Sequence, residues 1–190
     1  MKPNRVPTYG DVSIKAVGRL DAPRLQYLLE TDRAWLEPWE ATLPGLRQGV
    51  DARWLVSALK TQMRQGSGIG FTIRYKNVVV GQLNVANIIH GSVSSATIGY
   101  WIASNFAGKG ITTVAVALAI DYLFDDAGLH RVEIDIRPEN KASLRVVEKL
   151  GIRNEGLKER FIYIDGAWRD HLIFGITSEE RSGSMLDRLR

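Results

Sequence analysis

Gly99–Thr113, which reads GYWIASNFAGKGITT, is the stretch that decides the fold. Its start continues an alternating strand predicted over Ala96–Ile102, and its end begins a long helix with apolar residues near a 3.6-residue period. Gly108 and Gly110 allow dihedral angles that other residues avoid. Backbone N–H groups at such a turn point outward unpaired, and the helix dipole favours an anion. The stretch therefore predicts either a phosphate-binding loop or a tight turn that binds nothing.

Two other phosphate-binding patterns are not found in the chain. Lys109 is followed by Gly110 instead of the Ser or Thr of a Walker-type loop, which argues against a nucleotide hydrolase of that class. The loop also lies in mid-chain without GxGxxG and without a ribose-binding acid on a following strand. A dinucleotide-binding fold is therefore unsupported.

The order of elements is that of an α/β protein. A helix is predicted to begin at Asp21, whose carboxylate can cap free N–H groups, and two more helical regions cover about Ala34–Leu43 and Val50–Gln65. The remaining predicted elements are strands at 71–75, 78–89, 96–102 and 131–136, a helix at 140–150, and a hairpin of 160–164 with 168–176. We expect one domain over residues 1–176 and a polar, loosely held tail over 177–190.

Composition restricts the chemistry. The 190 residues include no cysteine, which excludes disulfides, thiolate zinc sites and a thiol nucleophile. The histidines at 90, 130 and 171 show no metal-binding spacing, so we expect no metal. The formal charge of +4 comes from basic residues interleaved with acids, without a basic run. We therefore expect no direct binding of nucleic acid.

The location is predicted from two segments. The N-terminus MKPNRVPTYGDV lacks the apolar run of a signal peptide. Residues 78–108 carry no charge, but polar side chains such as Gln82 and Asn84 interrupt them too often for a membrane span. They are interpreted as buried strands, and we expect a cytoplasmic protein without a membrane partner.

Three segments together resemble the GCN5-related N-acetyltransferase (GNAT) family, and within it the ribosomal-protein-alanine N-acetyltransferases. They are Leu36–Glu40, Gly99–Thr113 and Asn140–Gly151, and the resemblance spans nearly the whole chain. It implies a single α/β domain with a mixed, mostly antiparallel sheet of about six to seven strands and flanking helices. Acetyl-CoA would be the cosubstrate, bound in a cleft between two splayed strands. The oligomeric state stays open between monomer and homodimer.

By this resemblance the loop holds the CoA diphosphate through backbone N–H groups. Asn105 replaces the family's usual glutamine or arginine and leaves those donors intact. Ile102 and Ala103 match the place where a backbone N–H polarises the thioester carbonyl. Arg145 and Lys149 are candidates by position to hold the 3′-phosphate, and either could equally be a solvated residue of the helix. The residues assigned to acetyl-CoA are Ile102, Ala103, Gly108, Lys109, Gly110, Ile111, Thr112, Asn140 and Ser143.

The resemblance also suggests two proton-transfer groups. Val147 stands where many family members carry a tyrosine acid, and Ser143 on the same helix face resembles the serine that the subfamily uses instead. The alternative for Ser143 is an ordinary serine on the helix surface or near the helix start. Asp135 matches the position of a glutamate base in a related enzyme. Asp135 could equally be a structural residue that is ion-paired with Arg137 or Arg131 on a face of the sheet.

The acceptor is predicted from its basicity and from one segment. An α-amine has a pKa of about 7.7–8.0 against about 10.4 for lysine, so it is more easily neutral. Leu36–Glu40 resembles the subfamily's acceptor wall, where Glu37 or Glu40 could attract the amine and Trp39 could pack behind it. Trp35, Trp39 and Trp54 could equally be helix-packing residues only. The leading hypothesis is acetylation of a protein N-terminus, such as that of a ribosomal protein; polyamines or amino sugars, or a non-catalytic CoA-binding module, are the alternatives.

Overall fold

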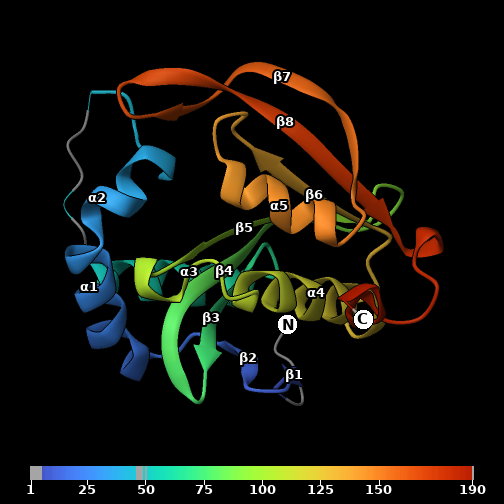
Figure 1. The fold of residues 1–190 in the computed structure, drawn as a ribbon, viewed down its shortest axis with the longest axis horizontal. Coiled ribbons are helices and arrows are strands. Elements are labelled where there is room, and N and C mark those ends of the chain that lie inside the picture. The colour runs from blue at the N-terminus through green and yellow to red at the C-terminus, as the bar shows by residue number, and fades with distance from the viewer. Residues whose placement is uncertain (1–5, 46–48, 50, 190) are drawn as a thin grey trace.

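The computed structural model describes residues 6–45, 49 and 51–189, and it has one twisted sheet with helices on both faces (Figure 1). The sheet has eight strands in the order β1-β2-β3-β4-β5-β6-β8-β7, and only β5 and β6 are parallel neighbours. This confirms the mixed, mostly antiparallel class. The strands are β1 Thr8–Tyr9, β2 Val12–Ala16, β3 Ile69–Tyr75, β4 Val78–Ile89, β5 Ser95–Ile102, β6 Arg131–Ile136, β7 Arg153–Ile164 and β8 Ala167–Thr177.

Two of these strands were not expected. β1 and β2 pair with each other and place β2 on β3, which extends the sheet at its N-terminal edge. Both are short, and short runs of this kind carry little periodic signal. The predicted strands over 78–89 and 96–102 are confirmed as β4 and β5. No helix within the described ranges is long and apolar enough to cross a membrane.

The helices form two layers. α4 and α5 cover one face of the sheet in the larger apolar core, and α1 and α3 cover the other face in a smaller core with Val17, Val79 and Ala103 (Figure 1). The helices are α1 Ala22–Thr31, α2 Arg33–Leu36, α3 Ala52–Gln65, α4 Ile111–Asp125 and α5 Lys141–Lys149, with 3₁₀ turns η1 Arg19–Asp21, η2 Glu37–Trp39, η3 Ser104–Phe106, η4 Ser178–Glu180 and η5 Met185–Leu189.

Two helix starts differ in detail from expectation. α1 begins where predicted, but Asp21 makes no cap bond to it; its carboxylate accepts from Gly18 N–H at 2.8 Å and from Arg74 Nη2 at 2.5 Å. Asp21 therefore ties η1 to β3 instead of capping the helix. For α3, Asp51 is the cap and accepts from two N–H groups of the first turn. The predicted start at Val50 lies outside the described residues.

The strands β5 and β6 separate along their length. Their parallel register covers only Ser95–Thr97 on β5 and Arg131–Glu133 on β6. β5 meanwhile stays paired with β4 up to Ile102. The carboxyl ends of β5 and β6 therefore diverge, as the resemblance implies, and leave a gap between the two strands.

A glycine allows β4 and β5 to stay close at this point. Gly81 is paired with Ile102, and a Cβ at Gly81 would collide with the carbonyl oxygen of Trp101 and lie 2.9 Å from Ile102 Cα. The pairing then continues past the strand, because Ala103 N–H donates to Val80 O at 2.9 Å. The end of β5 is thus held on β4 while its other edge is open.

The expectation of a loose tail over 177–190 is wrong for the described residues. Met185 is fully buried and belongs to the larger core. Asp121 on α4 accepts from Met185 N–H at 2.8 Å and from Arg181 Nη1 at 2.7 Å. A single apolar side chain in a polar segment gives little sequence signal, so its packing could be seen only once α4 was in place.

Candidate active site

A cavity of about 800 Å³ opens where β5 and β6 diverge. It is lined from four sides: by α1, α2, α3 and η2, by β4 and β5, by the loop into α4, and by α5. It contains eleven residues assigned above, namely Trp39, Glu40, Ile102, Gly108, Gly110, Ile111, Thr112, Asn140, Ser143, Arg145 and Lys149. The assigned residues that do not line it are Glu37, Ala103, Lys109 and Asp135.

The loop into α4 has the backbone of an anion cradle. Gly108 and Gly110 have φ of 74° and 75°, in the left-handed region that favours glycine. Gly110 is the N-cap of α4, has no side chain with which to cap it, and is followed by a first turn without acidic residues. The N–H groups at the start of α4 are therefore directed at the cavity without a competing carboxylate, as a phosphate site requires.

Backbone direction distinguishes Ile102 from Ala103. Successive residues of an antiparallel strand direct their N–H groups to opposite edges. Ala103 N–H bonds to Val80 on β4, which corrects the expectation that this N–H faces a thioester. The N–H of Ile102 must then be directed to the opposite edge, at the gap left by β6.

Trp35, for which the sequence leaves packing and substrate contact both open, lies against this point. Trp35 Nε1 donates to Ile102 O at 3.0 Å, and Trp35 lines the cavity while 41% exposed. The contact joins α2 to the end of β5. Its only sequence signal was an aromatic residue next to the predicted acceptor segment.

α5 lines the side of the cavity opposite β5. Asn140 is its N-cap, and Asn140 Oδ1 accepts from Ser143 N–H at 3.1 Å. Tyr100 on β5 donates its hydroxyl to Ser143 O at 3.4 Å, and burial raises the pKa of Tyr100 above its ordinary range. Val147 is buried in the core, so no acid replaces the family's tyrosine there. Ser143 is therefore the hydroxyl that α5 brings to the cavity.

Two polar side chains from β4 are a further feature of the cavity. Gln82 is 1% exposed and donates through Nε2 to Asn84 Oδ1 at 2.7 Å. Within the described chain Gln82 Oε1 is buried and has no hydrogen-bond partner. An unpaired buried oxygen costs about 1–3 kcal/mol, so a donor from a ligand would relieve that cost. The sequence showed these residues only as polar interruptions of an apolar strand.

The two faces of β4 and β5 divide the cavity. Gln82 is paired with Trp101, which packs against the smaller core on the side of α1 and α3. Leu83 is paired with Tyr100, and both belong to the larger core on the side of α4 and α5. A molecule held by the loop and α5 would therefore meet a second one, coming from the α1–α3 side, near Ile102.

The predicted acceptor wall is assembled in part. Trp39 and Glu40 line the cavity, and Glu37 does not. The guanidinium of Arg137 lies 5.3 Å from the Trp39 ring and donates to Pro38 O at 2.6 Å, while Glu40 is ion-paired with Arg33. The wall continues onto the hairpin, because Thr42 N–H donates to Tyr163 O at 2.9 Å.

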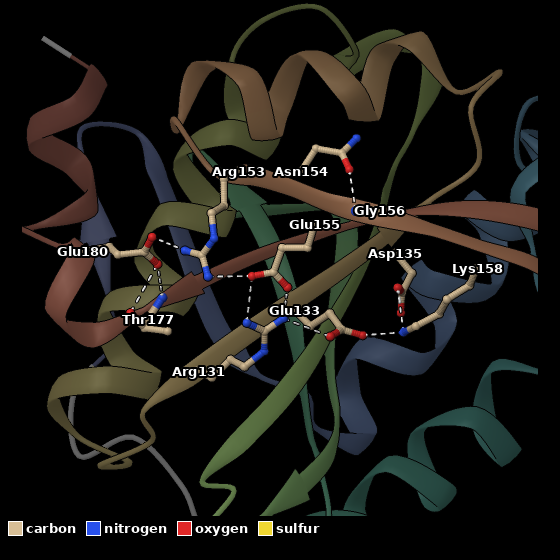
Figure 2. Close-up of polar contacts among 10 residues, drawn as sticks. All are labelled: Arg131, Glu133, Asp135, Arg153, Asn154, Glu155, Gly156, Lys158, Thr177 and Glu180. Carbon is tan, nitrogen blue, oxygen red and sulfur yellow. Dashed lines mark hydrogen bonds and ion pairs between the residues drawn. The ribbon is translucent and has the colours of Figure 1, made fainter.

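Asp135 belongs to a ladder of charges on β6, β7 and η4, which we call the charge ladder (Figure 2). Lys158 Nζ lies 3.1 Å from Asp135 and 2.6 Å from Glu133. Burial raises the pKa of Asp135, and Lys158 acts in the opposite direction. The other members, joined by ion pairs, are Arg131, Glu155, Arg153 and Glu180.

The charge ladder crosses β8 where that strand has no side chain. Gly175 is paired with Glu133 on one side and Arg153 on the other, and a Cβ there would lie 2.6 Å from Arg131 Nη2 and from Glu155 Oε1. The ion-paired alternative for Asp135 is thus the one observed, with Lys158 as partner instead of Arg137 or Arg131. Because Asp135 does not line the cavity, its geometry gives no support to a role as base.

Comparisons with known proteins agree with this geometry. A family model described as an acetyltransferase (GNAT) domain matches residues 12–153. RimJ of Mycobacterium smegmatis in complex with CoA-disulfide is similar with a TM-score of 0.88 and 40% identity, over 97% of this chain and 90% of that one. The ribosomal protein uS5-alanine N-acetyltransferase of Escherichia coli is 29% identical over 172 residues, which is 88% of each chain.

A further relative matches over a shorter stretch. The probable N-acetyltransferase YjcK of Bacillus subtilis is 38% identical over 102 residues. That match covers 54% of this chain and 56% of the relative. This chain therefore spans about half the length of that protein, in contrast to its coverage of the other two.

The charge ladder predicts the behaviour of an Asp135→Asn variant. We expect its kcat/KM with acetyl-CoA and an amine to stay within about twofold of the parent, because Asp135 does not line the cavity. Loss of a general base would instead lower kcat/KM by about 10²–10⁴-fold. A pH–rate profile of both proteins is the measurement. Glu133→Gln, which removes a neighbouring carboxylate of the same ladder, is the matched control. A hundredfold loss in Asp135→Asn alone would restore Asp135 as the base.

Proposed function

The chain belongs to the GNAT acetyltransferase family and is an acetyl-CoA-dependent acetyltransferase, and on that premise we propose that it acetylates the N-terminal α-amine of a protein. The proposed substrate class is a ribosomal protein. Two relatives support it: RimJ of M. smegmatis, and the E. coli enzyme named for alanine of ribosomal protein uS5.

One observation carries the choice of amine. The two carboxylates that line the cavity are both paired with arginine: Glu40 with Arg33, and Glu139 with Arg137 at 3.3 Å. The pKa of Glu139 is lowered, first by its own backbone N–H and then also by Arg137, which makes it a poorer proton acceptor. A site without a free carboxylate suits an amine that is already largely neutral near pH 8, as an α-amine is. A polyamine would need unpaired acids to hold its several charges.

The donor half of the cavity fits acetyl-CoA. Its start is the glycine cradle before α4, and Arg145 and Lys149 line the same cavity from α5 without a carboxylate partner in the described ranges. Backbone N–H groups and free cations are the partners that phosphates prefer. Acetyl-CoA supplies a thioester, whose acetyl group moves to the amine as the C–N bond forms and the C–S bond breaks.

Ile102 N–H is the proposed donor to the oxygen that becomes negative during transfer. Such a donor is worth about 2.7–4 kcal/mol when it is held in place beforehand. Two contacts restrain it: Ala103 N–H bonded to Val80 O, and Trp35 Nε1 bonded to Ile102 O. Both contacts hold the peptide group between Ile102 and Ala103, one from each edge of the strand, and this group directly follows the Ile102 N–H. The N–H is therefore restrained, which lowers the cost of reorganisation.

Ser143 is the proposed proton donor to the departing thiolate. Its hydroxyl lies in the first turn of α5, and the turn is oriented by Asn140 and by Tyr100. Tyr100 is the weaker candidate, because its hydroxyl already donates to Ser143 O.

Gln82 is the proposed positioning residue for the amine. Its Oε1 can accept an N–H from the acceptor and direct the nitrogen lone pair away from β4, toward the gap at Ile102. Asn84 keeps this oxygen oriented by occupying Nε2. The amine's surplus proton then leaves to water, since no lining carboxylate is free among the residues described.

The first experiment compares three acceptors in thiol-release assays. A peptide beginning with Ala or Ser should be acetylated, the same peptide with a blocked terminus should not react, and spermidine should react at least about tenfold more slowly because it is more basic. Preference for spermidine would move the substrate to small amines. Tight CoA binding without turnover of any acceptor would favour the binding-module alternative.

Ser143→Ala should lower kcat by about 10²-fold, the usual loss for one proton-transfer group, while the Kd for CoA stays unchanged. Steady-state kinetics and calorimetry measure the two quantities. Glu148→Ala is the control, since Glu148 is an exposed residue of the same helix that does not line the cavity. Unchanged turnover in Ser143→Ala would remove Ser143 from the mechanism.

Gln82→Met should raise the KM for the peptide by about five- to tenfold, the worth of one hydrogen bond, with the KM for acetyl-CoA unchanged. Its folding stability should change little, because the variant loses the bond to Asn84 but also the unpaired buried oxygen. Denaturant unfolding checks this. Leu83→Met, on the opposite face of β4, is the control. An unchanged peptide KM would contradict the positioning role.

A further inference from the structure

A second hollow, of about 480 Å³, lies on η1, α1 and α3. We call it the cationic groove. It shares none of its lining residues with the cavity described above. Its lining residues are Arg19, Ala22, Pro23, Arg53, Val56, Ser57, Lys60 and Arg64. Half of these are basic and none is acidic.

The basic side chains come from separate parts of the sequence. Arg19 is in η1, and the other three are in α3, where Arg53, Lys60 and Arg64 are spaced so that they fall on one face. The three extend over roughly 16 Å of helix at about 1.5 Å per residue. The expectation of no nucleic-acid binding rested on the absence of a basic run, but the fold gathers a basic cluster without one.

Nearby carboxylates do not neutralise the groove. Asp21, two residues after Arg19, is occupied by Gly18 N–H and by Arg74. Asp51, before Arg53, accepts from the N–H groups of Arg53 and Trp54. Across residues 6–45, 49 and 51–189, none of the four basic side chains has an ion pair.

Several arginines elsewhere in the described residues do form ion pairs, unlike those of the groove. Arg74, Arg131, Arg153 and Arg181 each have at least one acidic partner. Arg145 and Lys149 also lack one among the described residues, and they line the cavity proposed to hold the phosphates of CoA. The cationic groove therefore repeats, away from that cavity, the charge pattern of the proposed phosphate end.

We propose that the cationic groove binds the phosphodiester backbone of RNA. Guanidinium groups fit phosphate oxygens in pairs, and the hydroxyl of Ser57 adds a donor. A concave groove with cations along a helix suits a strand laid along it, whereas a flat bilayer surface would not reach its floor of Ala22 and Val56, which are buried. Three of the four cations are arginine, the residue best suited to phosphate.

The groove and the cavity share two helices. α3 contributes Leu55 to the cavity and Val56 to the groove, and α1 contributes Leu29 to the cavity and Ala22 to the groove. RNA held in the groove would therefore lie next to the α1–α3 side, from which the acceptor is proposed to enter. This use of the groove, to hold an RNA-containing particle while a protein terminus reacts, rests on the proposed function.

The test measures binding of a short labelled single-stranded RNA by fluorescence anisotropy at several salt concentrations. Arg53→Gln/Lys60→Gln should bind at least about tenfold more weakly than the parent, and the slope of log K against log salt should fall by about 0.7 for each phosphate that is no longer neutralised. The control, Lys15→Gln/Lys76→Gln, removes the same charge from exposed residues of β2 and the β3–β4 turn, and should change affinity less than twofold.

Three results would overturn the proposal: no RNA binding by the parent protein, an equal decrease of affinity in the control variant, or tighter binding of phosphatidylserine vesicles or of a polyglutamate peptide than of RNA. Acetylation of a free peptide is measured on the same preparations and should be the same in parent and groove variant. RNA binding that is abolished in the groove variant, together with no peptide acetylation by any protein, would reject the proposed function and leave the RNA site standing.

Discussion

The rest of the site depends on one constraint, the divergence of β5 from β6 while β5 remains bonded to β4. After Thr97 the free edge of β5 has no neighbouring strand, so its N–H and C=O groups need other partners. Trp35 provides one, to Ile102 O, and the N–H of Ile102 is left facing the cavity. The loss of pairing between β5 and β6 would weaken an ordinary sheet. In this protein it leaves the Ile102 N–H free to act as the donor that the proposed chemistry requires.

The two helical layers stabilise the sheet although β5 and β6 are not paired along their full length. α4 and α5 pack on one face, and α1 and α3 on the other, so each face of the divergent strands is closed by its own core. Gly81 lets β4 approach β5 where a side chain would force them apart. On the far side of the gap, β6 is joined to β7 by the charge ladder, which crosses β8 at Gly175. Asp135 thus has a structural partner in Lys158 and no place at the cavity.

One helix, α3, separates the cavity from the cationic groove, and both are lined by basic side chains. α3 turns an apolar side chain, Leu55, toward the cavity and basic ones toward the cationic groove. In the proposed function the cavity holds a cosubstrate through backbone donors of fixed direction, whereas the groove holds a polymer through flexible, charged side chains. The first kind of contact gives geometry for a reaction, and the second gives salt-dependent affinity.

Local pattern in the sequence determined much of the fold and half of the site. The glycine loop, the helix that starts near Asn140 and the strands β4 and β5 are set by residues close together in the chain, so periodicity and motif spacing were enough to predict them. Contacts between distant residues were decided only by the tertiary structure. Trp35 contacts Ile102, which is 67 residues away in the chain. Lys158 pairs with Asp135 in place of Arg131 and Arg137, which are closer in sequence, and Met185 is buried next to α4. None of these contacts recurs at a regular spacing, so periodicity does not reveal them, and each partner is chosen by which side chains the assembled sheet brings within reach.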